Sequence, residues 1–155
     1  MDRTVETAVV GASAIECYNV AIDFSKYQEW AGDIKDVTVY ETDDQHRGTL
    51  VSFRAAAYGR SASYTLRYSY PTKDPLTINW VQEKADLTAK LDGTYVFIPL
   101  DDGRTQVTYA LEVELLVPIP GFVKRRAETK IIHSALKDLK ERAEAKAASN
   151  GVGSR

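Results

Sequence analysis

Short runs of alternating apolar and polar residues fill the middle of the chain, and this alternation constrains the fold more than any other feature. From Ile34 to about Leu116 the runs are separated by turn residues, which predicts about six consecutive antiparallel strands. After Pro118, Pro120 and Gly121 the period becomes helical, between about Phe122 and Ala147. The chain is therefore expected to form an α+β fold in which a sheet is followed by one long helix.

The long helix is expected to bury one apolar face. Its members are Ile132, Ala135, Leu136, Leu139 and Ala143. At about 1.5 Å per residue the helix is roughly 40 Å long, which is enough to cross a whole sheet. The tail at 148–155 is expected to be disordered, so 1–147 is expected to be a single domain.

The segment before the sheet predicts one further strand and two short helices, which brings the expected sheet to about seven strands. Residues 3–10 alternate as a strand does, and Ser13 and Glu16 have the spacing of a helix capping box. A second short helix is expected over 23–31. The face expected on the first helix is Ile15, Tyr18 and Ile22, and the expected cap of the second helix is Asp23 or Ser25.

Composition limits the classes of protein that fit. The chain has 155 residues, of which 44% are hydrophobic and 27% charged, and this suits one globular domain with a sizeable core. No apolar run approaches the roughly 20 residues of a membrane span, and the N-terminus lacks a secretory pattern, so a cytoplasmic location is expected. With 20 basic and 22 acidic residues, no nucleic-acid partner is expected.

Two hairpin turns set the strand register in the expected sheet. A two-residue turn at Gly59–Arg60 pairs Ala57 with Ala62, Ala55 with Tyr64, Phe53 with Leu66 and Val51 with Tyr68, and leaves Arg54 and Arg67 facing solvent. In the later hairpin a two-residue turn would split the apolar set between two faces. A three-residue loop, 101–103, with Gly103 left-handed, instead pairs Phe97 with Val107, Tyr95 with Tyr109 and Gly93 with Leu111, and places Lys90 opposite Glu114.

The inner face obtained in this way contains no charged residue. Its small members, Ala55, Ala57 and Gly93, leave space between the sheet and the helix unless the interior is a fully packed core. We expect a ligand in that space to contact a mostly apolar set with several tyrosine hydroxyls. The set is Val51, Phe53, Ala55, Tyr64, Leu66, Tyr68, Trp80, Tyr95, Phe97, Tyr109, Leu111, Ile132 and Leu136.

Four short motifs, in order along the chain, resemble those of one known superfamily. They are Asp23-Phe24-x-x-Tyr27-x-x-Trp30, Gly93-x-Tyr95-x-Phe97, Gly103-x-Thr105-x-Val107 and Pro120-Gly121-Phe122. From about Arg3 to Glu144 the chain resembles the START-related superfamily of polyketide cyclases/dehydrases and lipid-transport proteins (SRPBCC). The resemblance implies the helix-grip fold, a curved antiparallel sheet wrapped around the C-terminal helix with a ligand tunnel between them. It also implies that Tyr27 and Trp30 are packing anchors.

Three classes of function remain open at this point. The first is a carrier or binding protein for an apolar or amphipathic small molecule such as a lipid, a quinone or a polyketide. The second is a polyketide cyclase or dehydratase, which needs a proton donor or acceptor in the cavity. The candidates for that role are Tyr64, Tyr68, Tyr95 and Tyr109. The third is an interaction module without a ligand, and the oligomeric state is not indicated.

The sequence predicts neither a cofactor nor a metal site. Cys17 is the only cysteine and is expected to be buried, and His46 and His133 lack the spacing of metal ligands. Three consecutive cations, Lys124, Arg125 and Arg126, stand where the dipole of the long helix opposes positive charge. They are either a solvated face or a transient contact with an anionic membrane surface or headgroup, with Phe122 and Val123 dipping inward.

Overall fold

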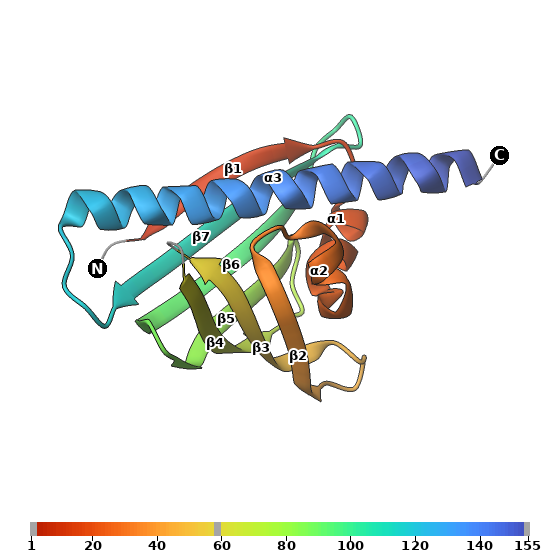
Figure 1. Ribbon diagram of the computed structural model, residues 1–155. Helices are drawn as coiled ribbons and strands as arrows, with labels where there is room; N and C mark the ends of the chain where they lie inside the picture. Colours follow the sequence, from red (N-terminus) through yellow and green to blue (C-terminus); the bar gives the residue numbers. More distant parts are fainter. Residues whose placement is uncertain (1–2, 58–59, 154–155) are drawn as a thin grey trace.

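Seven antiparallel strands form one sheet in the order β1-β7-β6-β5-β4-β3-β2 (Figure 1). The computed structural model describes residues 3–57 and 60–153. The strands are β1 (Thr4–Val10), β2 (Ile34–Thr42), β3 (Gly48–Ala57), β4 (Arg60–Ser69), β5 (Leu76–Ala85), β6 (Thr88–Pro99) and β7 (Thr105–Leu115). The helices are α1 (Ala14–Ile22), the 3₁₀ helix η1 (Phe24–Lys26), α2 (Tyr27–Trp30) and α3 (Gly121–Gly153).

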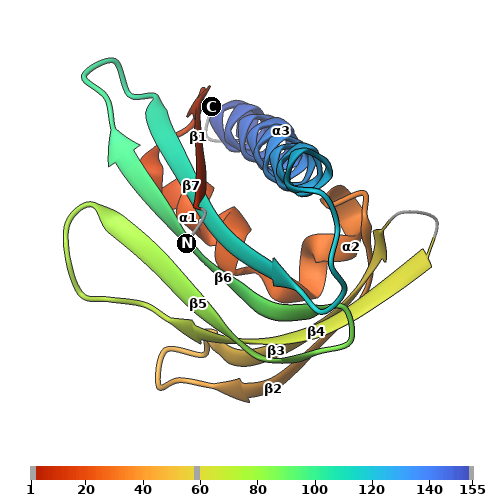
Figure 2. The ribbon, with the colours of Figure 1, turned by 90° about the vertical axis from the view of Figure 1, so that its left-hand side faces the viewer.

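The expected fold class is confirmed. Strands β2 to β7 follow one another across the sheet, and β1 joins the far edge beside β7. Figure 2 shows that the sheet is curved, with α3 on its concave side. The inner face of the sheet is therefore the face that α3 and the N-terminal helices cover.

The N-terminal helices are positioned by local hydrogen bonds. The Ser13 hydroxyl accepts a bond from the Glu16 amide at 3.2 Å, and the Glu16 carboxylate accepts one from the Ser13 amide at 2.9 Å, so the capping box is confirmed. The expected buried face of α1 is partly wrong, because Ile15 is 52% exposed. The residues that α1 buries are Cys17, Tyr18, Val20 and Ala21.

The second short helix is a 3₁₀ turn that continues into a single α-turn. Asp23 occupies its N-cap position, but the carboxylate makes no cap bond and accepts a hydrogen bond from the Ser25 hydroxyl at 3.0 Å. The first turn is instead held by backbone bonds, among them the Lys26 amide to the Asp23 carbonyl at 3.1 Å.

The register of β3 and β4 differs by two residues from the expected one. The observed pairs are Val51–Leu66, Phe53–Tyr64 and Ala55–Ala62. The two residues between these strands, 58–59, lie outside the described residues, and so does the side chain of Ala57. Because side chains alternate with a period of two, a shift by two residues leaves each one on the same face. The expected inner face therefore survives, although its cross-strand neighbours change.

The register of β6 and β7 is the expected one. Gly103 has φ +86° and the Leu100 amide donates to the Arg104 carbonyl at 2.8 Å, as a three-residue loop with a left-handed glycine requires. The pairs Gly93–Leu111, Tyr95–Tyr109, Phe97–Val107 and Lys90–Glu114 all follow. Lys90 forms its ion pair diagonally, with Glu112 at 2.7 Å.

Strand β5 joins the inner face through Trp80, which pairs with Tyr68 and Gly93 and is 5% exposed. Gly93 does not leave space there, contrary to expectation. A Cβ atom at Gly93 would lie 2.3 Å from Cζ2 of Trp80 and 2.8 Å from the Ala110 carbonyl oxygen. The indole ring occupies the volume that a side chain at position 93 would need.

Helix α3 buries the expected face, in which Ile132, Leu136, Leu139 and Ala143 are at most 4% exposed and Ala135 is partly buried. It packs over β1, β7 and α1. The helix extends to Gly153, beyond the expected end at Ala147 and into the segment for which disorder was expected. In the described part of the chain no helix is both long and apolar enough to cross a membrane.

Candidate ligand-binding site

The residues expected to contact a ligand come together on the inner face, but they are of two kinds. Most lie in one core cluster with the apolar face of α3. Val51, Phe97 and Ile132 have no exposed surface, so a solvent-filled space does not touch them. Tyr64 and Tyr95 are partly buried and pack against the edge of that cluster. The expected set therefore divides into a packed core and an accessible aromatic margin.

A connected network of aromatic rings joins this margin to the packed core. It includes the stacked pair Phe53–Tyr64, whose centroids are 5.4 Å apart, and the edge-to-face pair Tyr95–Tyr109 at 4.6 Å. Trp80 contacts Tyr95 at 5.4 Å between ring centroids, which joins β5 to β6. The members are Tyr18, Phe24, Tyr27, Trp30, Phe53, Tyr64, Tyr68, Tyr70, Trp80, Tyr95, Phe97 and Tyr109.

The tyrosines of the network differ in what their hydroxyls do. Tyr27 donates to the Ala21 carbonyl and Tyr70 to the Gly48 carbonyl, so these two are structural. The sequence did not single out Tyr70, which lies just beyond the end of β4. Tyr27 and Trp30 contact each other with centroids 4.8 Å apart, as packing anchors would.

The hydroxyls of the four candidate tyrosines make no hydrogen bond within residues 3–57 and 60–153. None of the four hydroxyl oxygens is among the fully buried polar atoms that lack a hydrogen-bond partner. Each is therefore reachable by water. We call Tyr64, Tyr68, Tyr95 and Tyr109 the tyrosine quartet. A ligand on this surface would meet aromatic faces and four hydroxyl donors.

Burial raises the pKa of every member of the quartet above the ordinary value of a phenol. Neighbouring ionisable groups add to the effect, such as Tyr27 for the pKa of Tyr68, and Tyr109 and Asp138 for the pKa of Tyr95. At neutral pH the four groups are therefore neutral phenols. They can donate a hydrogen bond to a carbonyl oxygen, but they are poor bases.

The sequence had suggested that the inner side of the molecule is free of charge. The structure shows a buried carboxylate on α3 instead. Glu128 is 1% exposed, and its Oε2 atom lies 4.0 Å from the Lys124 ammonium. It precedes Ile132 by four residues on α3, so an extension of the apolar helix face would have found it. Asp138 accepts a hydrogen bond from the Gly32 amide at 3.2 Å and lies near enough to Tyr95 to raise the pKa of that tyrosine.

Two pockets lie near the sheet and the N-terminal helices, and Tyr64 of the tyrosine quartet lines the first of them. One, of about 410 Å³, is on the outer face of β2 to β5 and is lined by rows of polar residues such as Ser52, Thr65 and Arg54. The other, of about 230 Å³, lies between α1, α2 and α3 and is lined by residues including Trp30 and Arg142. By strand alternation the polar side chains named here point away from the inner face, whereas Phe53 and Tyr64, which also line this pocket, belong to the inner face.

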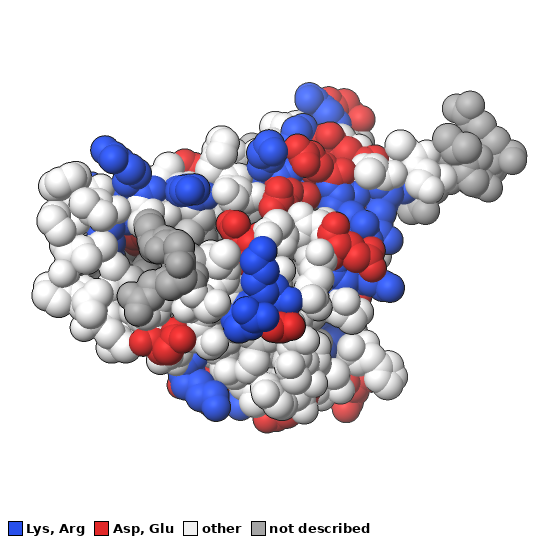
Figure 3. Space-filling view, viewed as in Figure 1, with Lys and Arg blue, Asp and Glu red and all other residues white. Residues whose placement is uncertain are grey.

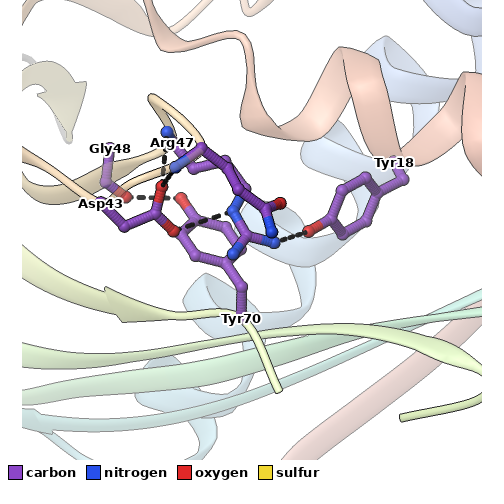
Figure 4. A network of polar contacts seen from close by, with 6 residues as sticks. Tyr18, Asp43, Arg47, Gly48 and Tyr70 are labelled. Atoms are coloured by element: carbon purple, nitrogen blue, oxygen red, sulfur yellow. Dashed lines mark hydrogen bonds and ion pairs between the residues drawn. The ribbon is translucent and has the colours of Figure 1, made fainter. Parts of the chain in front are cut away.

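A polar network connects the β2–β3 hairpin to α1 and to Tyr70, just beyond β4 (Figure 4). The Arg47 guanidinium donates to Asp43 at 2.9 Å and to the Tyr18 hydroxyl at 3.0 Å, and it lies 4.5 Å from the centre of the Tyr70 ring. Partial burial opposes the charge of Arg47, but the bonds to Tyr18 and Asp43 outweigh it and raise the pKa of the guanidinium. The partners of the Arg47 guanidinium are side chains of the fold, so we assign this network a structural role, which is to hold the β2–β3 hairpin against α1 and Tyr70.

The other candidate residues from the sequence do not form a common site. His46 lies in the β2–β3 hairpin with φ 64°, and His133 is exposed on α3. In residues 3–57 and 60–153 no three His, Cys, Asp or Glu side chains are grouped to hold a metal ion. Phe122 and Val123 do not dip inward, because they are 62% and 38% exposed.

Comparison with known proteins identifies the family. A family model described as polyketide cyclase / dehydrase and lipid transport matches residues 10–140, which is most of the chain. The chain belongs to this polyketide cyclase/dehydrase and lipid transport family. The resemblance inferred from the four sequence motifs is thereby confirmed. A comparison with curated proteins finds no match.

Solved structures of the family's fold are similar over almost the whole chain. A START superfamily protein from Mycobacterium smegmatis has a TM-score of 0.86 at 22% identity and covers 92% of this chain and 97% of its own. The Zhui aromatase/cyclase from Streptomyces sp. R1128 has a TM-score of 0.79 at 17% identity, covering 92% and 93%. A STAR-related lipid transfer protein from Xanthomonas axonopodis has a TM-score of 0.72 at 15% identity, covering 91% and 85%. At these identities the likeness concerns the fold.

Proposed function

We propose that the protein binds an apolar or amphipathic small molecule between the inner face of the sheet and α3. The supporting observation is the tyrosine quartet, an aromatic surface whose four hydroxyls are reachable and make no hydrogen bond to the described part of the chain. An unused donor on an apolar wall favours a ligand that supplies an acceptor. We infer a largely apolar ligand with carbonyl or similar oxygens, such as a quinone or a polyketide, in preference to a saturated lipid.

Binding of a matched pair of probes tests this proposal. A naphthoquinone and its hydrocarbon counterpart are titrated while tryptophan emission is recorded, because Trp80 contacts Tyr68, Tyr95 and Tyr109 within the network. The quinone is expected to bind with about one-to-one stoichiometry and to quench this emission. Tyr64→Phe and Tyr95→Phe should each weaken quinone binding about fivefold, which corresponds to one hydrogen bond of about 1 kcal/mol. Binding of the hydrocarbon should not change.

Tyr40→Phe is the matched control, since Tyr40 is 62% exposed on β2, outside the aromatic network. It should leave both affinities unchanged. If neither probe binds and no compound of a broad apolar panel raises the melting temperature, the proposal is wrong. A ligand at 100 times its dissociation constant should stabilise the protein by about 2.7 kcal/mol, which a thermal melt detects.

A second candidate function is cyclase or dehydratase chemistry, and the position of Asp138 favours it. A neutral Tyr95 hydroxyl can polarise a ketone, and a carboxylate on α3 close to it can take the proton from the adjacent carbon. Incubation with an aromatic polyketide precursor, followed by product analysis, separates the two functions. Recovery of intact ligand supports binding alone, whereas turnover that is lost in Asp138→Asn and Tyr95→Phe supports catalysis.

A further inference from the structure

The connection from β7 to α3 lies at one end of the molecule (Figure 1), and large apolar side chains are exposed on it. Leu116 is 57% exposed, Val117 61%, Phe122 62% and Val123 38%. These residues flank Pro118 and Pro120 within one short segment, residues 116–123, so they share one surface. Single exposed apolar residues are ordinary, but four in one segment form a patch that marks an interaction site.

The backbone holds this segment at both ends. The Leu116 amide donates to the Leu87 carbonyl at 3.1 Å, and the amides of Val123 and Lys124 donate to the Pro120 carbonyl at 3.0 and 3.1 Å. Each proline between these points also fixes its own φ. The apolar side chains are thus presented on an anchored loop that projects from the fold.

Basic residues follow the apolar segment on the first turns of α3. Residues 116–131 contain four basic residues and one acidic residue, in a chain whose net charge is −2. The acidic residue, Glu128, is buried, whereas Arg125, Arg126 and Lys130 are exposed. Arg126 and Lys130 follow Val123 by three and seven residues, so they share its helix face. Figure 3 shows an uncharged surface at this end of the molecule with basic side chains beside it.

We propose that residues 116–123, together with Arg125, Arg126 and Lys130, form a docking surface for an anionic lipid bilayer. Apolar side chains on a projecting loop can enter the interfacial layer, while cations beside them meet lipid phosphates and anionic headgroups. Positive charge in the first turns of α3 opposes the helix dipole, so helix stability does not account for it. The charge complements an anionic surface. This surface goes beyond the proposed ligand binding and stands without it.

Vesicle flotation at low salt tests the surface. The wild-type protein is expected to float with phosphatidylcholine vesicles that contain phosphatidylserine and to stay in solution with phosphatidylcholine alone. Each Lys or Arg near an anionic surface strengthens binding about fivefold, so Arg125→Gln with Arg126→Gln should weaken it about 25-fold. Val117→Ser with Phe122→Ser should reduce flotation as well. Added salt should reduce the flotation of the wild-type protein and should not restore the flotation of the variants.

Matched variants elsewhere on the surface provide the controls. Lys73→Gln with Lys137→Gln removes two exposed cations, and Val39→Ser with Tyr40→Ser removes two exposed apolar side chains from β2. Both control proteins should float as the wild type does, and circular dichroism melts should confirm that all four variants are folded. Wild-type protein that fails to bind anionic vesicles, or site variants that bind as well as the controls, would overturn the inference.

Two further measurements distinguish membrane docking from self-association and from ligand binding. If Val117→Ser with Phe122→Ser converts a dimer to a monomer in sedimentation while wild-type flotation is absent, the patch is an interface between copies of this chain and the inference is wrong. Quinone binding in solution should be unchanged in both site variants. A protein that floats but binds no apolar probe would retain the docking surface and lose the proposed function.

Discussion

At the scale of single residues, Gly93 and Trp80 show how one side chain can fill the space beside a residue that has no side chain. The indole of Trp80 packs directly over the Cα of Gly93 in the neighbouring strand. The ring is also in edge-to-face contact with Tyr109, with centroids 5.6 Å apart. The glycine thus determines where the ring at the centre of the aromatic network lies.

Gly93→Ala is expected to destabilise the protein strongly. The added methyl group would lie 2.3 Å from the indole and 2.8 Å from a backbone carbonyl oxygen. We therefore expect the free energy of unfolding, measured by chemical denaturation, to fall by about 1–3 kcal/mol or more. Gly32→Ala is the control, because the nearest atom to its added Cβ is 3.9 Å away, and its effect should stay within about 0.5 kcal/mol. In a double-mutant cycle, Trp80→Leu should make Gly93→Ala less costly. Additive effects would show that the indole is not the obstacle.

Cys17 should be chemically inert in the folded protein. Burial raises the pKa of its thiol to about 11, and the side chain has no exposed surface. The reactive thiolate is therefore scarce at neutral pH as well as inaccessible. A thiol reagent such as dithionitrobenzoate should label the native protein no faster than the protein unfolds, and should label it within seconds to minutes in denaturant. Rapid labelling under native conditions would contradict the burial of α1.

At the scale of elements, α3 is attached to the rest of the fold by polar bonds as well as by its apolar face. Glu144 accepts a hydrogen bond from the Gly11 amide at 2.7 Å, and Asp138 accepts one from the Gly32 amide at 3.2 Å. Lys140 donates to the Val9 carbonyl at 2.9 Å. These bonds join the second half of α3 to β1 and to the connections that flank the N-terminal helices.

The attachment through Glu144 should depend on pH. Hydrogen bonds from Lys140 and from the Gly11 amide hold the pKa of this carboxyl below its ordinary value of 4.5. Because the folded pKa is the lower one, the stabilisation is present above the unfolded pKa and is lost as the pH falls through the folded pKa. Glu144→Gln should lower the free energy of unfolding by about 0.5–1 kcal/mol at pH 7, a small value because the side chain is partly exposed.

Urea unfolding of wild type and Glu144→Gln at a series of pH values provides the measurement. The difference between the two proteins should shrink as the pH falls below about 4.5. Glu141→Gln is the control, since Glu141 is paired with Lys137 on the surface of the same helix and should cost less. A difference that is independent of pH would show that the charge of Glu144 does not contribute.

At the scale of the whole molecule, the question is whether the inner face holds a ligand or only packs against itself. Ala55 lies opposite Ala62, two pairs beyond the stacked rings of Phe53 and Tyr64 and on the same face of the sheet. It is 8% exposed, whereas Val51 on the same strand face is fully buried. The two positions therefore represent the margin and the core of the same surface.

Ala55→Trp is expected to affect ligand binding, whereas Val51→Trp is expected to affect stability. A tryptophan at position 55 can extend into space used by a ligand, so probe binding should be lost while the melting temperature changes little. At position 51 it must displace packed side chains, and we expect a cost of about 1–3 kcal/mol or more. Thermal melts with and without a quinone probe make the comparison. Equal and large destabilisation by both changes would indicate a fully packed interior.

Local patterns in the sequence determined the order of the elements and the face of each strand. The alternation within β3, β4, β6 and β7 places Phe53, Tyr64, Tyr95 and Tyr109 inward. A register shift by an even number of residues does not change this. The capping box at Ser13 and the left-handed Gly103 are equally local, since each depends on residues within one turn. For this reason the fold, and the residues that face the interior, could be predicted without coordinates.

Tertiary structure alone decided which of those residues meet one another. The two-residue shift between β3 and β4 preserves alternation, so no pattern could reveal it, and it pairs Phe53 with Tyr64. Helix α1 turns Ile15 to solvent because Tyr18 packs against Phe97 in a distant strand. The accessible margin of the aromatic network likewise depends on how far α3 lies from each strand. Such distances arise from packing between residues far apart in the chain, and a local sequence period does not encode them.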